Sequence, residues 1–299
     1  MIRIQSVSKS FDGYPALDDL EMTIQTGSIY GLIGVNGAGK TTIIKHMSGM
    51  LRPDNGIITY DGDGIWENEV LKQKIGLIPD ELYFPNGYNM KDMCRIYRGF
   101  YESWNEDRFE EMARLFKLDM KKKLRAFSKG MKKQAMFCLV MSTMPMYLIL
   151  DEPIDGLDPI VRKLVWKFIV DDVADHQMSV LISSHNLKEM EGICDYIGII
   201  SHGRMLLERE LDSMKSDLHK IQVSFGTKSP QDPYEGLNLL HKESRGTVDL
   251  LIVRERAEKI EETLSEYDPI LFDILPLSLE EIFIYELGGE DDEISKLIF

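Results

Sequence analysis

Short apolar runs alternate with amphipathic stretches over the first two thirds of the chain. Apolar runs that end in polar residues predict buried strands at 74–80, 146–153 and 179–185, and 196–206 predicts two strands joined by a glycine turn. Helical spacing of apolar residues covers roughly 90–102, 105–117, 129–143, 159–174 and 187–193. Strands that alternate with helices indicate an α/β fold with a mostly parallel sheet covered by helices.

Two stretches refine this picture. Residues from about 83 to 127 show helical patterns and no convincing strand, which predicts a helical insertion between two strands. Residues 135–150 carry no charge, but they are shorter than the roughly 20 residues that a membrane-spanning helix needs, and Pro145 interrupts them. We expect a buried helix followed by a buried strand.

After Leu211 the pattern starts again on a smaller scale. Strands are predicted at 220–225, 247–253 and 269–275, and helices at 254–267 and 278–287. The last helix opens with a capping box from Ser278 to Glu281, and Gly288–Gly289 end it. Its predicted buried residues are Leu279, Ile282, Phe283 and Leu287. We expect one large domain at 1–210, with the insertion at about 83–127, and a small α+β domain at 211–299.

The charge is uneven along the chain. Of the formal net charge of −15, residues 210–299 contribute −12, from 21 acidic and 9 basic residues. This acidic balance disfavours a polyanionic partner, although seven lysines and arginines crowd residues 121–133. The cysteines are Cys94, Cys138 and Cys194; they are odd in number and far apart, which suits a reducing compartment. The first residues lack the apolar core of a signal peptide.

Residues 34–41, "GVNGAGKT", lie between a predicted strand and a predicted helix and match the phosphate-binding pattern G-x-x-x-x-G-K-[ST]. Glycines let backbone N–H groups curl around phosphates, Lys40 supplies a positive charge, and the Thr41 hydroxyl can bind Mg²⁺. A plain glycine-rich turn is the alternative, and the flanking strand and helix argue against it. The predicted nucleotide-binding residues here are Gly34, Asn36, Gly37, Ala38, Gly39, Lys40, Thr41 and Thr42.

Two carboxylates end the apolar run "YLILDE" at 147–152. Beside a phosphate loop, Asp151 is placed to hold Mg²⁺ through water, and Glu152 to orient and deprotonate an attacking water. Both would emerge at the carboxyl edge of the sheet, where α/β proteins bind ligands. His185 also follows a buried strand; it is either an ordinary strand-end histidine or a contact to the γ-phosphate. The predicted catalytic residues are Glu152, His185 and Lys40.

With these motifs in this order, residues 1–210 resemble the ATP-binding subunit of an ABC transporter, a P-loop NTPase. The resemblance places Phe11 against adenine, makes 151–159 the Walker B motif and D-loop, and makes 183–185 the switch region. It also places Asp158 of the D-loop among the nucleotide-binding residues. "FSKGM" at 127–131 stands at the signature position, with Ser128 and Gly130 kept for a γ-phosphate.

The chain departs from the family pattern in the signature and in the Q-loop. Lys129 and Met131 replace the glycine and glutamine of the usual Leu-Ser-Gly-Gly-Gln signature, and the exporter-type subgroup of the family shows similar "SKGM" signatures. The glutamine of the Q-loop falls at Asp80, a shorter and charged side chain. We still expect Asp80 to contact the metal or its water.

The resemblance implies ATP and Mg²⁺ as ligands and a motor subunit that drives a separate transmembrane permease, as in an exporter. Two ATPase chains, as a homodimer or a heterodimer, would sandwich two ATP molecules, with Ser128 and Gly130 acting on the opposite chain's ATP. The subunit would be cytoplasmic, at the inner face of the membrane through the permease.

Two alternatives stay open from the residues. The basic run would suit a soluble ABC-type ATPase that acts on nucleic acid or ribosomes, against which stand the acidic balance and the single cassette. A P-loop kinase of a small molecule would leave "FSKGM" and "DGLDP" without a role.

Overall fold

The computed structural model describes residues 1–213, 218–226 and 233–286, and it divides the chain into two compact units. The first contains residues 1–185 and 192–208, and the second contains residues 186–191 and the described residues from 209 onward. The six residues at 186–191, which the sequence analysis assigned to the large domain, thus group with the second unit.

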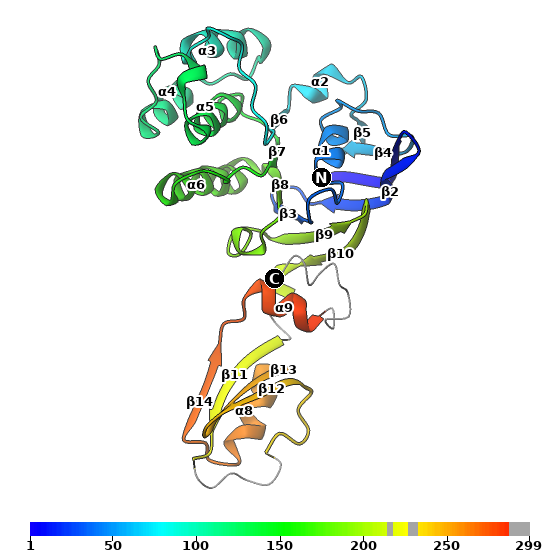
Figure 1. The fold of residues 1–299 in the computed structure, drawn as a ribbon, viewed down its shortest axis with the longest axis vertical. Coiled ribbons are helices and arrows are strands. Elements are labelled where there is room, and N and C mark those ends of the chain that lie inside the picture. Colours follow the sequence, from blue (N-terminus) through cyan, green and yellow to red (C-terminus); the bar gives the residue numbers. More distant parts are fainter. Residues whose placement is uncertain (214–217, 227–232, 287–299) are drawn as a thin grey trace. The chain divides into compact units, whose positions relative to one another are not determined.

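A six-stranded sheet forms the centre of the first unit, with strand order β10-β9-β3-β8-β7-β6 (Figure 1). Neighbouring strands from β9 to β6 run parallel, which confirms the predicted α/β class. Its strands are β3 (Ile29–Ile33), β6 (Ile75–Ile78), β7 (Tyr147–Asp151), β8 (Ser179–Ser184), β9 (Tyr196–Ser201) and β10 (Arg204–Glu210). All residues of β3, β7 and β8 are buried, as expected of strands covered on both faces.

A second, antiparallel sheet completes this unit, and the sequence analysis did not predict it. Its order is β2-β1-β4-β5, built from β1 (Ile2–Phe11), β2 (Tyr14–Ile24), β4 (Asn55–Tyr60) and β5 (Asp63–Gly64). Ile4, Leu20 and Ile58 of this sheet form one core with Ile44 of α1 (Lys40–Met47) and Leu181 of the parallel sheet. α1 is therefore held by apolar contacts on its buried side, and its first turn faces the carboxyl edge of β3.

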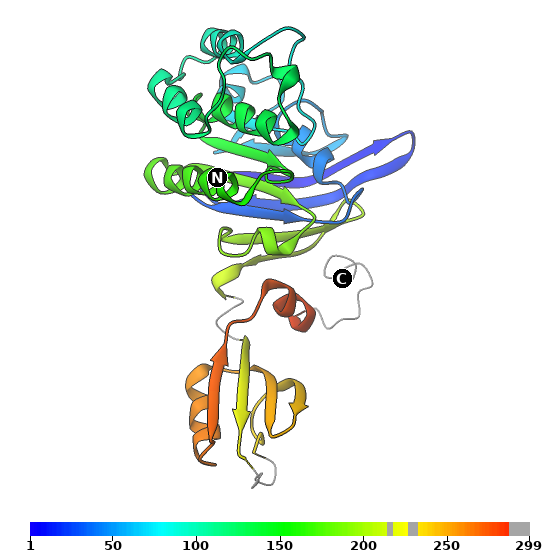
Figure 2. The same cartoon turned by 60° about the vertical axis from the view of Figure 1, so that its left-hand side comes forward.

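The predicted insertion consists of helices, as expected. It contains α3 (Met90–Phe100), α4 (Glu106–Leu115) and the short η1 (Leu124–Ala126), and it leads into α5 (Lys129–Met141); α2 (Glu69–Lys72) precedes it. In both views α3, α4 and α5 gather beyond the β6 end of the sheet (Figures 1 and 2). α5 is buried from Lys133 to Met141, so the uncharged stretch is a core helix that leads into β7, as predicted.

α6 (Pro159–His176) follows β7 and begins at a capping aspartate, Asp158, with proline in its first turn. The helix predicted at 187–193 is wrong: only a single 3₁₀ turn, η2 (Leu187–Glu189), forms there. Beyond this turn, Gly192 adopts φ +79°, a left-handed conformation that an α-helix does not contain.

The second unit contains a four-stranded antiparallel sheet of order β12-β13-β11-β14. Its elements are β11 (Leu218–Ser224), β12 (Leu239–Arg245), β13 (Val248–Arg254), β14 (Leu271–Leu275), α8 (Ala257–Ser265) and α9 (Leu279–Glu286). The sequence analysis missed β12. The predicted capping box is present: Ser278 and Glu281 exchange backbone-to-side-chain hydrogen bonds of 3.2 and 3.0 Å, and Leu279 and Ile282 are buried.

Predictions for the Phe283 side chain, Leu287 and Gly288–Gly289 lie outside the described part. The three cysteines are buried, and none of them is in a disulfide. Among the helices in the described ranges, none is long and apolar enough for a membrane span.

Candidate active site

The loop at residues 34–39 joins β3 to α1. Gly37 and Gly39 adopt φ of +84° and +112°, which residues with side chains rarely adopt. A Cβ on Gly39 would also lie 2.9 Å from the Ala16 carbonyl oxygen. No side chain caps the N-terminus of α1, so the first-turn N–H groups are left for an anion, as a phosphate loop requires.

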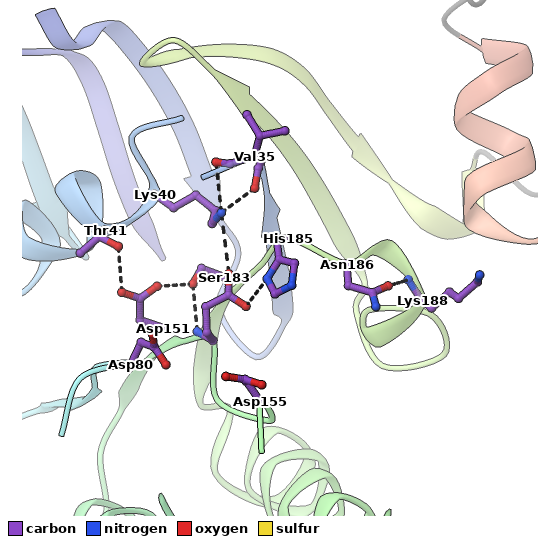
Figure 3. A network of polar contacts seen from close by, with 12 residues as sticks. Val35, Lys40, Thr41, Asp80, Asp151, Asp155, Ser183, His185, Asn186 and Lys188 are labelled. Atoms are coloured by element: carbon purple, nitrogen blue, oxygen red, sulfur yellow. Dashed lines mark hydrogen bonds and ion pairs between the residues drawn. The ribbon is translucent and has the colours of Figure 1, made fainter. Parts of the chain in front are cut away.

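Lys40 begins α1, and its ammonium group lies inside the loop. Its Nζ donates to the carbonyl oxygens of Gly34 at 2.5 Å and Val35 at 3.4 Å, and lies 3.7 Å from Glu152 Oε1 (Figure 3). Burial lowers the pKa of Lys40, and the carboxylates of Glu152 and Asp151 oppose this shift. A phosphate would provide the buried cation with a stronger partner than these carbonyl groups do.

Asp151 is the last residue of β7, and two hydroxyl groups orient its buried carboxylate. Thr41 Oγ1 donates to Oδ2 at 3.1 Å, and Ser183 Oγ of β8 donates to Oδ1 at 2.5 Å. The pairing of β7 with β8 places Asp151 directly opposite Ser183. The sequence analysis named Ser183 as part of a motif but did not assign it this orienting role.

Glu152 lies one residue beyond β7, and both of its carboxylate oxygens have cationic or polar neighbours. His185 Nδ1 lies 2.9 Å from Oε2, opposite the Lys40 contact on Oε1. Burial raises the pKa of Glu152, while His185 and Lys40 lower it. A carboxylate with a raised pKa beside a phosphate loop is suited to accept a proton from water. The structure thus brings together the three predicted catalytic residues.

A cavity lies between the loop and the two carboxylates. Its lining residues are Ala16, Val35, Asn36, Gly37, Gly39, Lys40, Thr41, Thr42, Asp80, Asp151 and Glu152. Asp80 follows β6, and its presence here supports the predicted position of the Q-loop. None of the residues at 127–131 lines the cavity.

The residues present fit a Mg²⁺ ion that is bound jointly with phosphates. Thr41 Oγ1 and Asp151 Oδ2 already converge, and Asp80 lines the same cavity. The described residues contain no cluster of three or more metal-binding side chains. Mg²⁺ commonly binds through one or two protein oxygens together with water and substrate phosphates, which matches this sparse set.

Phe11 and Asp158 stay predictions as nucleotide contacts. Phe11 is 44% exposed, with Lys9 Nζ 5.7 Å from its ring centroid, and it does not line the cavity. The Asp158 carboxylate accepts hydrogen bonds from the backbone of Ile160 and Val161, both at 3.1 Å. In this structure Asp158 caps the N-terminus of α6.

Ser128 is the N-cap of α5, and its hydroxyl accepts from Met131 N at 3.2 Å. Lys129 is paired with Asp155 at 2.6 Å, and the buried Lys133 is paired with Asp80 at 3.2 Å. The sequence analysis missed Lys133 and Asp155. The available signal was a lysine directly before a long uncharged stretch, where a charge must find a buried partner.

Comparison with known proteins agrees with this geometry. The sequence model of the ABC transporter family matches residues 17–155. The ABC transporter ATP-binding protein YtrB of Bacillus subtilis (strain 168) is 33% identical over 290 residues, which cover 97% of this chain and 99% of YtrB. The lantibiotic transport ATP-binding protein SrtF of Streptococcus pyogenes is 33% identical over 230 residues, covering 75% of this chain and 98% of SrtF.

Among solved structures, an ATP-binding subunit of an ABC transporter has the same fold. It superposes with a TM-score of 0.67 at 27% identity and covers 72% of this chain and 92% of its own. The glycine loop, the Asp151–Glu152 pair and the full-length match to YtrB all lead to one family. The chain therefore belongs to the ATP-binding proteins of ABC transporters, the subunits that bind and hydrolyse ATP.

Proposed function

We propose that this chain is the motor subunit of an exporter, and that it hydrolyses ATP as one of two paired ATPase chains. One observation carries the pairing: the cavity around Lys40 and Glu152 has no lining residue from the signature at 127–131. A γ-phosphate in this cavity would therefore receive Ser128 and Gly130 from a second chain. That chain is a copy of this one or a related ATPase subunit.

The N-terminus of α5 has the chemistry that this contact needs. Ser128 presents a hydroxyl there, and the first-turn N–H groups of a helix favour an anion. Two chains arranged head to tail would then complete two equivalent sites.

At each site, Thr41 and Asp151 would hold Mg²⁺, with Asp80 as a further oxygen ligand. Mg²⁺ held there would supply positive charge to the transferring phosphates. Lys40 would leave the loop carbonyl groups and bind the same phosphates. Glu152 would orient a water in line with the γ-phosphate and accept its proton, while His185 holds the opposite carboxylate oxygen.

Export through a separate permease is the transport role we propose. The "SKGM" signature resembles exporter-type ATPases, and the similar SrtF is named for lantibiotic transport. Attachment to the permease would place the chain at the cytoplasmic face of the membrane.

Two ion pairs in the structure weaken the case for a nucleic-acid ATPase. Of the seven cations at 121–133, Lys129 and Lys133 are ion-paired with Asp155 and Asp80, and Lys133 is buried. Fewer cations are then available for phosphate contacts than the sequence suggests.

Light scattering of the Glu152→Gln variant tests the pairing. This change should slow hydrolysis while ATP stays bound. Adding ATP with Mg²⁺ to the purified variant should therefore double the measured particle mass, from a monomer to a dimer. Adding Ser128→Arg should abolish the dimer, because a long side chain would fill the space of the γ-phosphate. A Glu152→Gln chain that binds ATP and stays monomeric, or a dimer that tolerates Ser128→Arg, would overturn pairing through the signature between copies of this chain.

A further inference from the structure

Three residues on the first turns of α5 contact the segment after β7 in the same chain. Lys129 Nζ lies 2.6 Å from Asp155 Oδ2, and Lys133 Nζ donates to the Glu152 carbonyl oxygen at 2.5 Å. Between them, Gly130 lies so close to Gly156 that a Cβ on Gly130 would be 2.7 Å from its carbonyl oxygen. Positions 129, 130 and 133 lie along neighbouring turns of the helix, so α5 packs along residues 152–156.

Of the two lysines, Lys133 is by far the more deeply buried. Only 2% of its side chain is exposed, and a buried ammonium needs compensating partners. Those found are the Glu152 carbonyl and the Asp80 carboxylate, 3.2 Å away, which also lines the nucleotide cavity. Lys133 therefore bridges the backbone of the predicted base and the wall of the site.

The backbone of Glu152 needs such support. Its φ is +48°, in the left-handed region that non-glycine residues seldom adopt. Conformations of this kind persist only where surrounding contacts fix them. The Glu152 N–H donates to the carbonyl oxygen and to the Oγ of Ser183, both at 3.2 Å. The Glu152 carbonyl oxygen accepts a hydrogen bond from Lys133 Nζ.

We propose that Lys133 is a positioning residue for ATP hydrolysis, fixing the backbone of Glu152 so that its carboxylate meets the attacking water. Lys129 extends the same contact through Asp155, which gives the lysine in place of the usual signature glycine a task within its own chain. This proposal rests on the proposed function, in which Glu152 is the base. In this proposal α5 has two roles: Ser128 binds the ATP of the partner chain, and Lys133 positions Glu152 of its own chain.

Steady-state and single-turnover hydrolysis by Lys133→Met tests the proposal, with Lys132→Met as the matched control. Methionine keeps the length of the buried chain and removes the donor. Misplacing a reacting group by about 1 Å can cost on the order of 100-fold. We expect kcat to fall by roughly 10- to 100-fold, with the Kd for ATP within about threefold of the wild type. The Lys132 side chain makes no hydrogen bond or ion pair with the described residues, and Lys132→Met should hydrolyse ATP normally.

Lys133→Arg, which keeps the charge and the donors, should recover part of the lost kcat. The proposal is overturned if Lys133→Met keeps the wild-type kcat, or if Lys133→Met loses ATP binding in the same proportion as turnover and Lys133→Arg recovers nothing. Glu152→Gln separates this proposal from the proposed function. An inactive Glu152→Gln beside a fully active Lys133→Met rejects only the positioning role, whereas a fully active Glu152→Gln rejects the base itself.

Discussion

Glu152 has the features of a general base, and each has a local cause. It follows the buried strand β7, its side chain is only 14% exposed, and Lys40 and His185 contact its two oxygens. Burial would protonate an isolated carboxylate, and the two cationic or polar neighbours oppose this. The net result is a pKa above the usual value of a glutamate.

Glu152→Gln removes the proton acceptor and leaves the shape of the site nearly unchanged. We expect turnover to fall by about 10²- to 10⁴-fold, the usual contribution of a general base. ATP binding should persist because the phosphate loop is intact. Phosphate release and nucleotide binding measure the two effects, and wild-type turnover in the variant would reject Glu152 as the base.

The pKa directions at this site also predict how activity depends on pH. Glu152 must be ionised to act, and its pKa is raised from the usual 4.5, so kcat/KM should fall on the acid side at a higher pH than for an ordinary glutamate. Lys40 must be protonated, and burial lowers its pKa from 10.5, so the alkaline fall should come earlier than for an exposed lysine. A pH profile of kcat/KM, which reports on the ATP-free enzyme, measures both, and an acid limb at or below pH 4.5 would contradict the raised pKa.

At the scale of elements, the close approach of α5 to the segment after β7 depends on Gly130. Alanine there would place its Cβ 2.7 Å from a backbone oxygen. We expect Gly130→Ala to lower the free energy of unfolding by about 1–3 kcal/mol, as for other overpacked sites. Gly99 in α3 is the control: a Cβ there meets nothing within 4 Å, and alanine should stabilise the helix by about 0.5–1 kcal/mol. Urea unfolding measures the free energy of unfolding of both variants. Equal changes in Gly130→Ala and Gly99→Ala would argue against a tight contact at Gly130.

Helices α4 and α6 are joined by the buried ion pair of Arg108 and Asp172. Their side chains are 16% and 7% exposed, and burial raises the pKa of Asp172 while Arg108 lowers it. Arg108→Met should cost about 3 kcal/mol, because it leaves a buried carboxylate without its cation. Arg98→Met, which breaks a more exposed pair with Glu106, should cost less than about 1 kcal/mol. Similar losses of unfolding free energy in the two variants would refute this difference.

The sequence predicted elements well where periodicity is simple and poorly where it is interrupted. The buried strands β3, β7 and β8 each contain a run of apolar residues, so the parallel sheet could be predicted from the sequence. β1 and β2 contain register shifts near Val7 that break the alternation of buried and exposed residues. β12 is exposed along nearly its whole length and has no apolar face to detect.

At the scale of the whole molecule, the sequence located the nucleotide loop and both carboxylates but not what holds them. Glycine spacing and strand ends are local patterns, so Lys40, Asp151 and Glu152 could be found from short motifs. Lys133 acts on a residue 19 positions away through its backbone, and no local pattern encodes that contact. The expectation that a second chain completes the site likewise followed from the family resemblance and not from a local sequence pattern.

Mixing two inactive variants tests the central claim of a site shared between chains. Lys40→Ala should disable the nucleotide loop of its own site, and Ser128→Arg should disable the site of its partner. In a mixed pair, one site carries both defects and the other is complete. Since each mixed pair has one complete site out of two, an equimolar mixture should recover up to about half of wild-type phosphate release, whereas each variant alone stays inactive. If the wild-type chain alone hydrolyses ATP and the mixture stays as inactive as its components, the site is not shared between copies of this chain.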